Sequence, residues 1–255
     1  MKTQISKVGL IGFGKAGKAV ASVILRSAAF SLEWIFRNKS NANVSSAKEI
    51  LDIESDDKAS IFSRNDRSME ELLDGNPVDF IIDFSSAQGI YEYGRQAGER
   101  NVTIISAISH YGDKEKNFLK ELSEKTAVFW APNITLGINF LLMASKLLRV
   151  IAPDADVEIV EEHFKQKSGV SGSAVKIARE LDVDPGNINS IRAGGIVGKH
   201  QLIFGFPYQT VRLIHESISR EAFGTGALFA AANMVGKPKG LYSFEDLLAP
   251  YFKMG

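Results

Sequence analysis

Hydrophobic and polar residues alternate in two different ways along the chain, and the change falls near residue 133. Before it, short apolar runs are separated by longer segments that suit amphipathic helices. Strands that alternate with helices are typical of a parallel sheet covered on both faces. The predicted strands are 7–12, 32–37, 59–62, 79–84, 102–107 and 127–130, and the predicted helices are 15–28, 45–51, 68–73, 89–100 and 114–124.

The pattern after residue 133 predicts a different architecture. A long apolar helix is expected at 134–151, a strand at 157–160 and a helix at 171–181. Three segments then follow one another without room for helices, so we expect antiparallel strands at 189–197, 200–206 and 210–218. Two helices, 224–235 and 243–248, are predicted to end the sequence. The change predicts a domain boundary near Asn133.

Composition narrows the class of protein. The 255 residues are 45% hydrophobic, which is enough to build one large domain or two small ones. Thirty Lys and Arg residues balance thirty Asp and Glu residues, so we expect no nucleic-acid partner, because such binders carry a basic excess. The absence of cysteine excludes disulfides, thiolate zinc sites and a catalytic thiol, and no metal-ligand pattern is visible. We also expect no signal peptide and no membrane span, hence a cytoplasmic protein.

A glycine-rich loop follows the first predicted strand. Gly12, Gly14 and Gly17 form a G-x-G-x-x-G pattern that leads into a predicted helix. In a dinucleotide-binding loop the first glycine permits a tight turn, the second lets the backbone approach a pyrophosphate, and the third allows close packing of helix on strand. The helix N-terminus then faces the phosphates. We predict a nicotinamide dinucleotide site that uses Gly12, Phe13, Gly14, Lys15, Ala16 and Gly17; the alternative is a tight turn without a ligand.

The end of the second predicted strand bears on the choice of cofactor. An acidic residue there favours NAD, and a basic residue favours the 2′-phosphate of NADP. The strand ends at Arg37, Asn38 and Lys39, and Glu33 lies too early. We therefore predict that Arg37 and Asn38 bind NADPH in preference to NADH, which remains possible. The alternative is an ordinary solvated strand end.

A second group of residues suits an anionic substrate. His163 and Lys167 place two nitrogen groups near the end of the predicted strand at 157–160. Ser171, Gly172 and Ser173 open the next helix, and a helix start of small residues offers N–H groups and hydroxyls to a carboxylate. The alternative is a helix cap at Ser171 followed by a solvated loop. His200 and His215 are interpreted as ordinary structural or surface histidines.

Four segments resemble the dihydrodipicolinate reductase family, also called 4-hydroxy-tetrahydrodipicolinate reductase, in their order and spacing. They are 78–86 (VDFIIDFSS), 131–139 (APNITLGIN), 158–174 (EIVEEHFKQKSGVSGSA) and 192–200 (RAGGIVGKH). A common fold alone does not produce such motifs. The resemblance implies an α/β fold with a Rossmann-like dinucleotide-binding domain, formed by 1–133 and 224–255. It also implies an α+β substrate-binding and oligomerisation domain with an open mixed sheet, formed by 134–223, and a homotetramer.

The resemblance also implies an activity and roles for residues. Members reduce 4-hydroxy-tetrahydrodipicolinate, a cyclic imine-type dicarboxylate, to tetrahydrodipicolinate with NAD(P)H in lysine and diaminopimelate biosynthesis. By position, His163 is the proton donor, Lys167 pairs with substrate charge, and Gly172 and Ser173 hold a carboxylate. The positions that the resemblance adds to the cofactor site are Phe84, Ser85, Ala107, Ser109, Pro132 and Asn133.

The sequence departs from the family pattern in the substrate segment. Phe164 replaces the family's second histidine, and the loop 168–173 is one residue shorter and lacks its Asp and Pro. Two alternatives therefore stay open. One is a paralogue that reduces another small cyclic imine or oxo acid, and the other is a nucleotide-binding sensor without catalysis.

Overall fold

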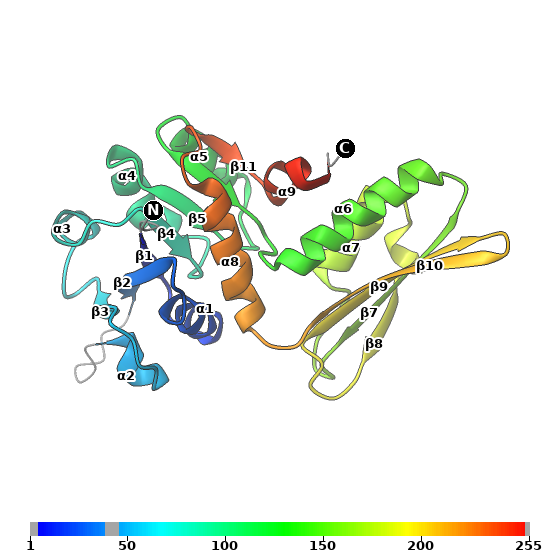
Figure 1. Cartoon of the computed structure of the whole chain (residues 1–255), viewed down its shortest axis with the longest axis horizontal. Coiled ribbons are helices and arrows are strands. Elements are labelled where there is room, and N and C mark those ends of the chain that lie inside the picture. The colour runs from blue at the N-terminus through cyan, green and yellow to red at the C-terminus, as the bar shows by residue number, and fades with distance from the viewer. Residues whose placement is uncertain (1–4, 39–45, 253–255) are drawn as a thin grey trace. The chain divides into compact units, whose positions relative to one another are not determined.

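The computed structural model describes residues 5–38 and 46–252, which fold into two compact units (Figure 1). The first unit comprises 1–134 and 223–255, and the second comprises 135–222. The sequence suggested boundaries after residues 133 and 223, one residue from each of these limits. Within the described ranges, no helix combines the length and apolarity that crossing a membrane requires.

A seven-stranded parallel sheet forms the centre of the first unit. The strand order is β11-β6-β5-β4-β1-β2-β3, which is the doubly wound order of dinucleotide-binding domains with one strand added beside β6. The order reverses between β1 and β4, and ligands bind at such a reversal in open α/β sheets. The strands are β1 (Ser6–Ile11), β2 (Phe30–Arg37), β3 (Ser60–Ser63), β4 (Phe80–Asp83), β5 (Thr103–Ser106), β6 (Ala127–Trp130) and β11 (Gly240–Tyr242).

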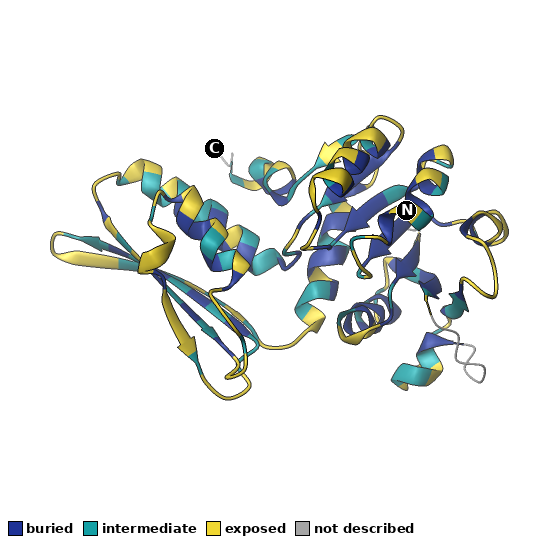
Figure 2. Ribbon diagram, turned by 180° about the vertical axis from the view of Figure 1, so that it is seen from behind, coloured by how far each residue is buried: buried dark blue, intermediate teal, exposed yellow. Residues whose placement is uncertain are grey.

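Helices cover the sheet of the first unit, with their apolar sides toward it. Figure 2 shows the strands of this unit almost wholly buried and the outer sides of its helices exposed. Local signals set the helix ends: α3 begins after Ser68, whose hydroxyl accepts from the Glu71 N–H while the Glu71 carboxylate accepts from the Ser68 N–H. The helices are α1 (Lys15–Leu25), α2 (Ala47–Leu51), α3 (Met69–Gly75), α4 (Ile90–Glu99), α5 (Asp113–Ser123), α8 (Glu221–Met234) and α9 (Phe244–Phe252).

One strand of the first unit was not predicted from the sequence. The chain after 223 was expected to be helical, but β11 lies between α8 and α9 and pairs in parallel with β6. Three residues are too few to show a period of two, so the strand is defined by its pairing partner and not by its own pattern.

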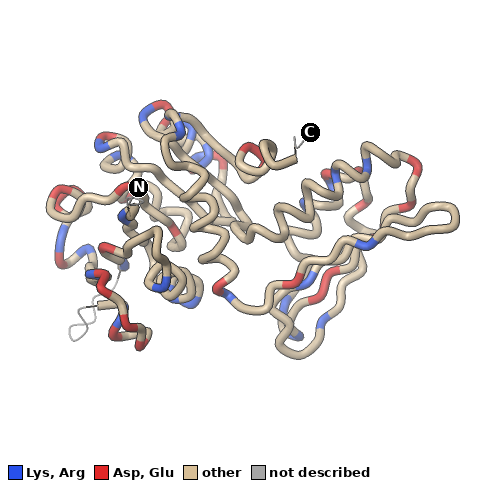
Figure 3. Tube along the Cα trace, in the orientation of Figure 1, with Lys and Arg blue, Asp and Glu red and all other residues tan. Residues whose placement is uncertain are grey.

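Basic and acidic residues are interspersed along α4 and α5 of this unit (Figure 3).

The second unit contains a four-stranded mixed sheet in the order β10-β9-β7-β8. Helices α6 and α7 contribute to a core with the buried residues Ile159, Ile177, Leu202 and Phe204. Strands β9 and β10 extend as a long hairpin (Figure 1). The elements are α6 (Leu136–Ile151), β7 (Asp156–His163), α7 (Gly172–Glu180), η1 (Pro185–Asn187), β8 (Asn189–Arg192), β9 (Gly198–Phe206) and β10 (Gln209–Ser217).

The expected antiparallel relation of segments 189–197 and 200–206 is wrong. Strand β8 ends at Arg192 and pairs in parallel with β7, and β9 lies on the other side of β7. The connection crosses the end of β7, where the Ala193 N–H donates to the His163 carbonyl at 3.0 Å. The short connection between β8 and β9 thus joins two strands that are not neighbours in the sheet, so its length did not imply that they pair. The antiparallel pairing of β9 with β10 is confirmed.

Candidate active site

The glycine-rich loop between β1 and α1 has the geometry of a phosphate cradle. Gly12 has a φ of +92°, and a Cβ there would lie 2.7 Å from the Phe84 carbonyl oxygen. A Cβ at Gly17 would lie 2.3 Å from the Gly12 carbonyl oxygen, so the helix can approach the loop only because residue 17 is glycine. A Cβ at Gly14, the residue before α1, would meet nothing within 4 Å. Open space therefore exists where a pyrophosphate would approach the helix N-terminus.

The other predicted cofactor residues follow strand ends at the same edge of the parallel sheet. The Gly12 N–H donates to the Phe36 carbonyl at 2.8 Å, and the Phe84 N–H donates to the Ile11 carbonyl at 2.9 Å. Gly14, Lys15, Asn38, Ser85, Ser109 and Pro132 are exposed, whereas Phe13, Ala16, Arg37, Phe84, Ala107 and Asn133 are partly or fully buried. The arrangement fits a dinucleotide laid across the strand ends, and each contact remains a prediction.

The Arg37 side chain carries one buried donor that no described residue accepts. It ends β2, and its buried Nε has no hydrogen-bond partner among the described residues. Buried donors are normally satisfied, so this nitrogen fits an acceptor such as a phosphate. Glu33 is buried within β2, and its carboxylate lies 3.1 Å from Lys58 Nζ. Lys39 lies outside the described residues.

A buried carboxyl group holds the turn that follows β4. Asp83 accepts from the backbone N–H and the hydroxyl of Ser85 at 2.8 and 2.6 Å, and from the Tyr93 hydroxyl at 2.9 Å. Burial raises the pKa of Asp83 to about 6, although these hydrogen bonds act in the opposite direction. The group thus fixes Ser85 beside the glycine-rich loop.

Asp83→Asn should remove a pH dependence of folding stability. A carboxyl group whose pKa rises from 3.8 to about 6 on folding stabilises the folded state below about pH 4 and loses that contribution as pH rises toward about 6. Asn has no such titration and can keep the acceptor for Ser85. The free energy of unfolding of the variant minus that of wild type should therefore be larger at pH 7 than at pH 4, by up to about 3 kcal/mol. Urea unfolding at both pH values measures it, and a pH-independent difference would contradict the assignment.

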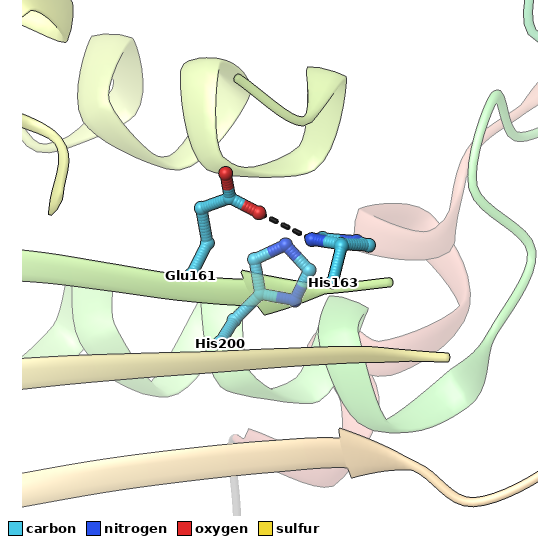
Figure 4. Close-up of side chains that lie close together, drawn as sticks. All are labelled: Glu161, His163 and His200. Carbon is cyan, nitrogen blue, oxygen red and sulfur yellow. Dashed lines mark hydrogen bonds and ion pairs between the residues drawn. The ribbon is translucent and has the colours of Figure 1, made fainter. Parts of the chain in front are cut away.

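The predicted residue His163 lies at the end of β7 in a cluster of buried polar side chains. Glu161, His163 and His200 are buried and lie side by side (Figure 4). The Glu161 carboxylate is hydrogen-bonded to His163 Nδ1, and the His163 and His200 rings meet edge to face with centroids 5.4 Å apart. These contacts place a histidine–carboxylate pair in the second unit.

The surroundings of His163 favour its neutral form in the free protein. Burial lowers the pKa of His163, Glu161 acts to raise it, and Lys167 and Arg192 act to lower it; the net pKa lies below the ordinary value. Burial likewise lowers the pKa of His200 to about 4. A nearby anion would raise the pKa of His163 and favour its protonation.

Helix α7 presents its N-terminus in the same unit. Ser171 caps it by accepting from the Ala174 N–H at 3.1 Å, and the same hydroxyl lies 2.9 Å from His200 Nε2. The Ser171 side chain is therefore engaged in capping, although sequence placed it among the substrate contacts. Gly172 is exposed, and a Cβ there would meet nothing within 4 Å. Lys167 is half-buried.

Three residues of this site had no assigned role at the sequence level: Glu161, Arg192 and His200. His200 is buried and bonds through Nε2 to Ser171, as a structural histidine would, but the buried Nδ1 of His200 and of His215 has no partner in the described part of the chain. Alternation along β9 was the available signal, since His200 shares the buried side with Leu202 and Phe204.

The three side chains of Figure 4 also have metal-like spacing. Their ligand atoms lie within 4.8 Å of one another. Glu161, however, already accepts from the Arg192 guanidinium, and a metal ion would face that positive charge at short range. We interpret the cluster as a hydrogen-bonded group, and the absence of a metal remains a prediction.

A glycine-rich loop shaped for a dinucleotide on a doubly wound sheet, with a histidine–carboxylate pair in a separate unit, is typical of an NAD(P)H-dependent oxidoreductase. Residues 6–134 match the family description "Dihydrodipicolinate reductase, N-terminus", and residues 134–248 match "Dihydrodipicolinate reductase, C-terminus". The chain belongs to the dihydrodipicolinate reductase family, and the family predicted from the four motifs is confirmed.

Individual relatives agree with this assignment. A 4-hydroxy-tetrahydrodipicolinate reductase of Thermosipho africanus is 31% identical over 80% of this chain and 94% of the relative. A protein of the same name from Caldanaerobacter subterraneus is 32% identical over 67% of this chain and 77% of the relative. The dipicolinate-bound dihydrodipicolinate reductase of Paenisporosarcina sp. TG-14 has the same fold, with a TM-score of 0.76 at 22% identity over 95% of this chain and 99% of that one.

Proposed function

We propose that this chain reduces 4-hydroxy-tetrahydrodipicolinate to tetrahydrodipicolinate in lysine and diaminopimelate biosynthesis. The observation that carries the proposal is the Glu161–His163 pair in the same unit as the N-terminus of α7, in a member of this family. The reaction consumes NAD(P)H and one proton and releases NAD(P)⁺ and water. The bound cofactor supplies the hydride, while the protein's own groups bind the dicarboxylate and provide the proton.

His163 is the proposed proton donor, and a dianionic substrate charges it. The lowered pKa of His163 favours the neutral ring in the free protein. Two carboxylates brought near the ring favour the imidazolium, so the proton is loaded as the substrate binds. Lys167 and the backbone N–H groups at Gly172 and Ser173 are the proposed carboxylate contacts, and Ser171 supports them as the helix cap.

Calorimetric titration with dipicolinate tests this linkage without turnover. Dipicolinate is the ligand of the Paenisporosarcina relative and carries two carboxylates. At pH 7.5 or so, binding should take up a fraction of a proton, seen as a dependence of the observed heat on the ionisation enthalpy of the buffer. The same titration of His163→Gln should lack that dependence. Binding with equal heats in all buffers would argue against His163 as the group that is charged.

NADPH is the proposed cofactor because Arg37 ends β2 with a buried Nε that has no hydrogen-bond partner within 5–38 and 46–252. Arg37→Ala should raise the Kd of NADPH by about tenfold or more, which corresponds to the loss of about 1.4 kcal/mol from one charge-assisted phosphate contact. The Kd of NADH, which lacks the 2′-phosphate, should change little and serves as the internal control. Fluorescence titration with both cofactors measures the contrast, and equal losses for the two would remove Arg37 from the phosphate site.

We propose a homotetramer whose subunits contact one another through the outer face of the second sheet. The strands alternate, so that His200, Leu202 and Phe204 face the helices while Ile203 lies on the opposite side. Ile214 is 54% exposed on β10 and pairs with Gln201 of β9, which alternates to the same outer side as Ile203. Covering such a face by identical copies is a common solution for an open sheet. Light scattering of the purified chain gives the oligomer size.

A further inference from the structure

The Glu161 side chain is held by three polar side chains of the second unit. Its carboxylate is completely buried and receives donors on both oxygens. The Ser190 hydroxyl donates to Oε1 at 2.6 Å, Arg192 Nη2 donates to the same oxygen, and Oε2 meets His163 Nδ1. Burial alone would raise the pKa of Glu161, but these neighbours reverse the effect and the net pKa lies below its usual range. The group is therefore an anion.

Arg192 is itself fixed by the backbone around it. Its Nε donates to the Lys167 carbonyl at 3.1 Å, its Nη1 donates to the Ile191 carbonyl at 2.7 Å, and its Nη2 donates to the Gly169 carbonyl at 2.6 Å. The guanidinium thus joins the loop that carries Lys167 to the carboxylate that contacts His163. A planar fork with several acceptors has little freedom to release Glu161.

We infer that Glu161 is a positioning residue, which holds His163 in the Nδ1–H tautomer and leaves Nε2 as the nitrogen that exchanges the proton. An ionised carboxylate has no hydrogen to donate, so the bond to Glu161 requires the hydrogen to be on Nδ1. The neutral ring then has its lone pair on Nε2. A Cβ at Gly198 would lie 3.0 Å from Nε2, so the glycine leaves space on this side of the ring.

The groups that face His163 come from four elements. Glu161 lies on β7, Arg192 on β8, His200 on β9 and Lys167 in the loop after β7. Among the described groups that act on the ring, Glu161 alone is negative, and the positive charges of Lys167 and Arg192 oppose its protonation. Removing the carboxylate charge should therefore lower the pKa of His163 further as well as change its tautomer.

The test is the tautomer of His163 in Glu161→Gln. The Gln oxygen should take the place of Oε1 and accept from Ser190 and Arg192, which turns the amide NH₂ toward His163 Nδ1. The ring then accepts at Nδ1 and carries its hydrogen on Nε2, the opposite tautomer. Glu162→Gln is the matched control, because Glu162 is the next residue on β7, faces the other side of the sheet and pairs with Lys199 at 2.9 Å.

Solid-state ¹⁵N NMR of histidine-labelled protein distinguishes the two tautomers by shift, whatever the size of the assembly. The chain has four histidines, and His163→Gln assigns the resonance. We expect Nδ1–H in wild type, in Glu162→Gln and in the conservative Glu161→Asp, and Nε2–H in Glu161→Gln. An Nε2–H tautomer in wild type, or no change in Glu161→Gln, would overturn the inference. If Glu161→Gln does not fold, the tautomer in the wild-type spectrum tests the inference by itself.

A kinetic readout separates positioning from mere structure. This part rests on the proposed function: kcat of Glu161→Gln should fall about 100-fold, within what general acid–base catalysis contributes. The Kd of dipicolinate should change less than about threefold, and the alkaline limb of the pH profile of kcat, along which the proton donor loses its proton, should move to lower pH. A fall in dipicolinate affinity without a change in kcat would contradict the role. An inactive wild type with the expected tautomer would count against the proposed function and leave the tautomer assignment standing.

Discussion

Replacing His163 with alanine is expected to lower kcat by about 10²–10⁴-fold, the range that a general acid contributes. The Kd of NADPH should stay within about twofold, because the dinucleotide loop belongs to the first unit and His163 to the second. Stability should fall only modestly, since Glu161 keeps its bonds to Ser190 and Arg192. Unchanged turnover would remove His163 from the chemistry.

Lys167 provides the companion test in the same loop. Lys167→Ala should raise the KM of the dicarboxylate and lower kcat, because one positive charge that faces the substrate is lost. Lys165→Ala is the matched control: it is an exposed lysine two residues earlier, and its backbone N–H bonds to the Gly194 carbonyl in either variant. Equal effects of the two substitutions would mean that general surface charge, and not a specific contact, is responsible.

Alanine substitutions of two glycines in the phosphate loop are expected to impair different properties, stability in one variant and cofactor affinity in the other. Gly17→Ala would place a Cβ 2.3 Å from the Gly12 carbonyl oxygen, which is rigid backbone, so unfolding should become easier by about 1–3 kcal/mol. Gly14→Ala meets nothing within 4 Å in the protein, so stability should change by less than about 0.5 kcal/mol. Its methyl group enters the space assigned to the pyrophosphate, and the Kd of NADPH should rise at least about tenfold.

Denaturant unfolding and cofactor titration of both variants separate the two roles. Gly14→Ala with normal cofactor affinity would show that the open space beside α1 is not the pyrophosphate site. Gly17→Ala with wild-type stability would show that the helix can move away from the loop at little cost. The pair therefore distinguishes a glycine that the fold needs from one that the ligand needs.

The first unit was predictable because its signals are local. Each strand of β1 to β6 shows a short apolar run, and the glycine-rich loop fixes where the first helix begins. β11 could not be predicted, since three residues carry no period and its pairing with β6 joins segments more than 100 positions apart. Hydrophobic periodicity could not indicate a protein family, whereas the four motifs predicted one, and that family is confirmed.

The second site was predictable in part. His163, Lys167 and the start of α7 stand close together in sequence, so spacing could suggest an anion site. Arg192 and His200 reach the same place from β8 and β9, and only sheet pairing brings them to β7. The role of Glu161 could not be predicted for another reason. A charged residue in a strand normally faces water, and Glu161 can be buried only because residues of the neighbouring strands are its partners.

The most direct measurement is turnover of the purified chain with 4-hydroxy-tetrahydrodipicolinate generated freshly by the upstream synthase, followed by loss of the near-ultraviolet absorbance of NADPH or NADH. The account predicts oxidation that depends on the synthase product, with NADPH the faster cofactor, and its near-complete loss in His163→Ala. No oxidation of either cofactor, with both NADPH and dipicolinate still bound, would contradict it. Other cyclic imine acids would then be tested, with Phe164 as the first position to explain the change of substrate.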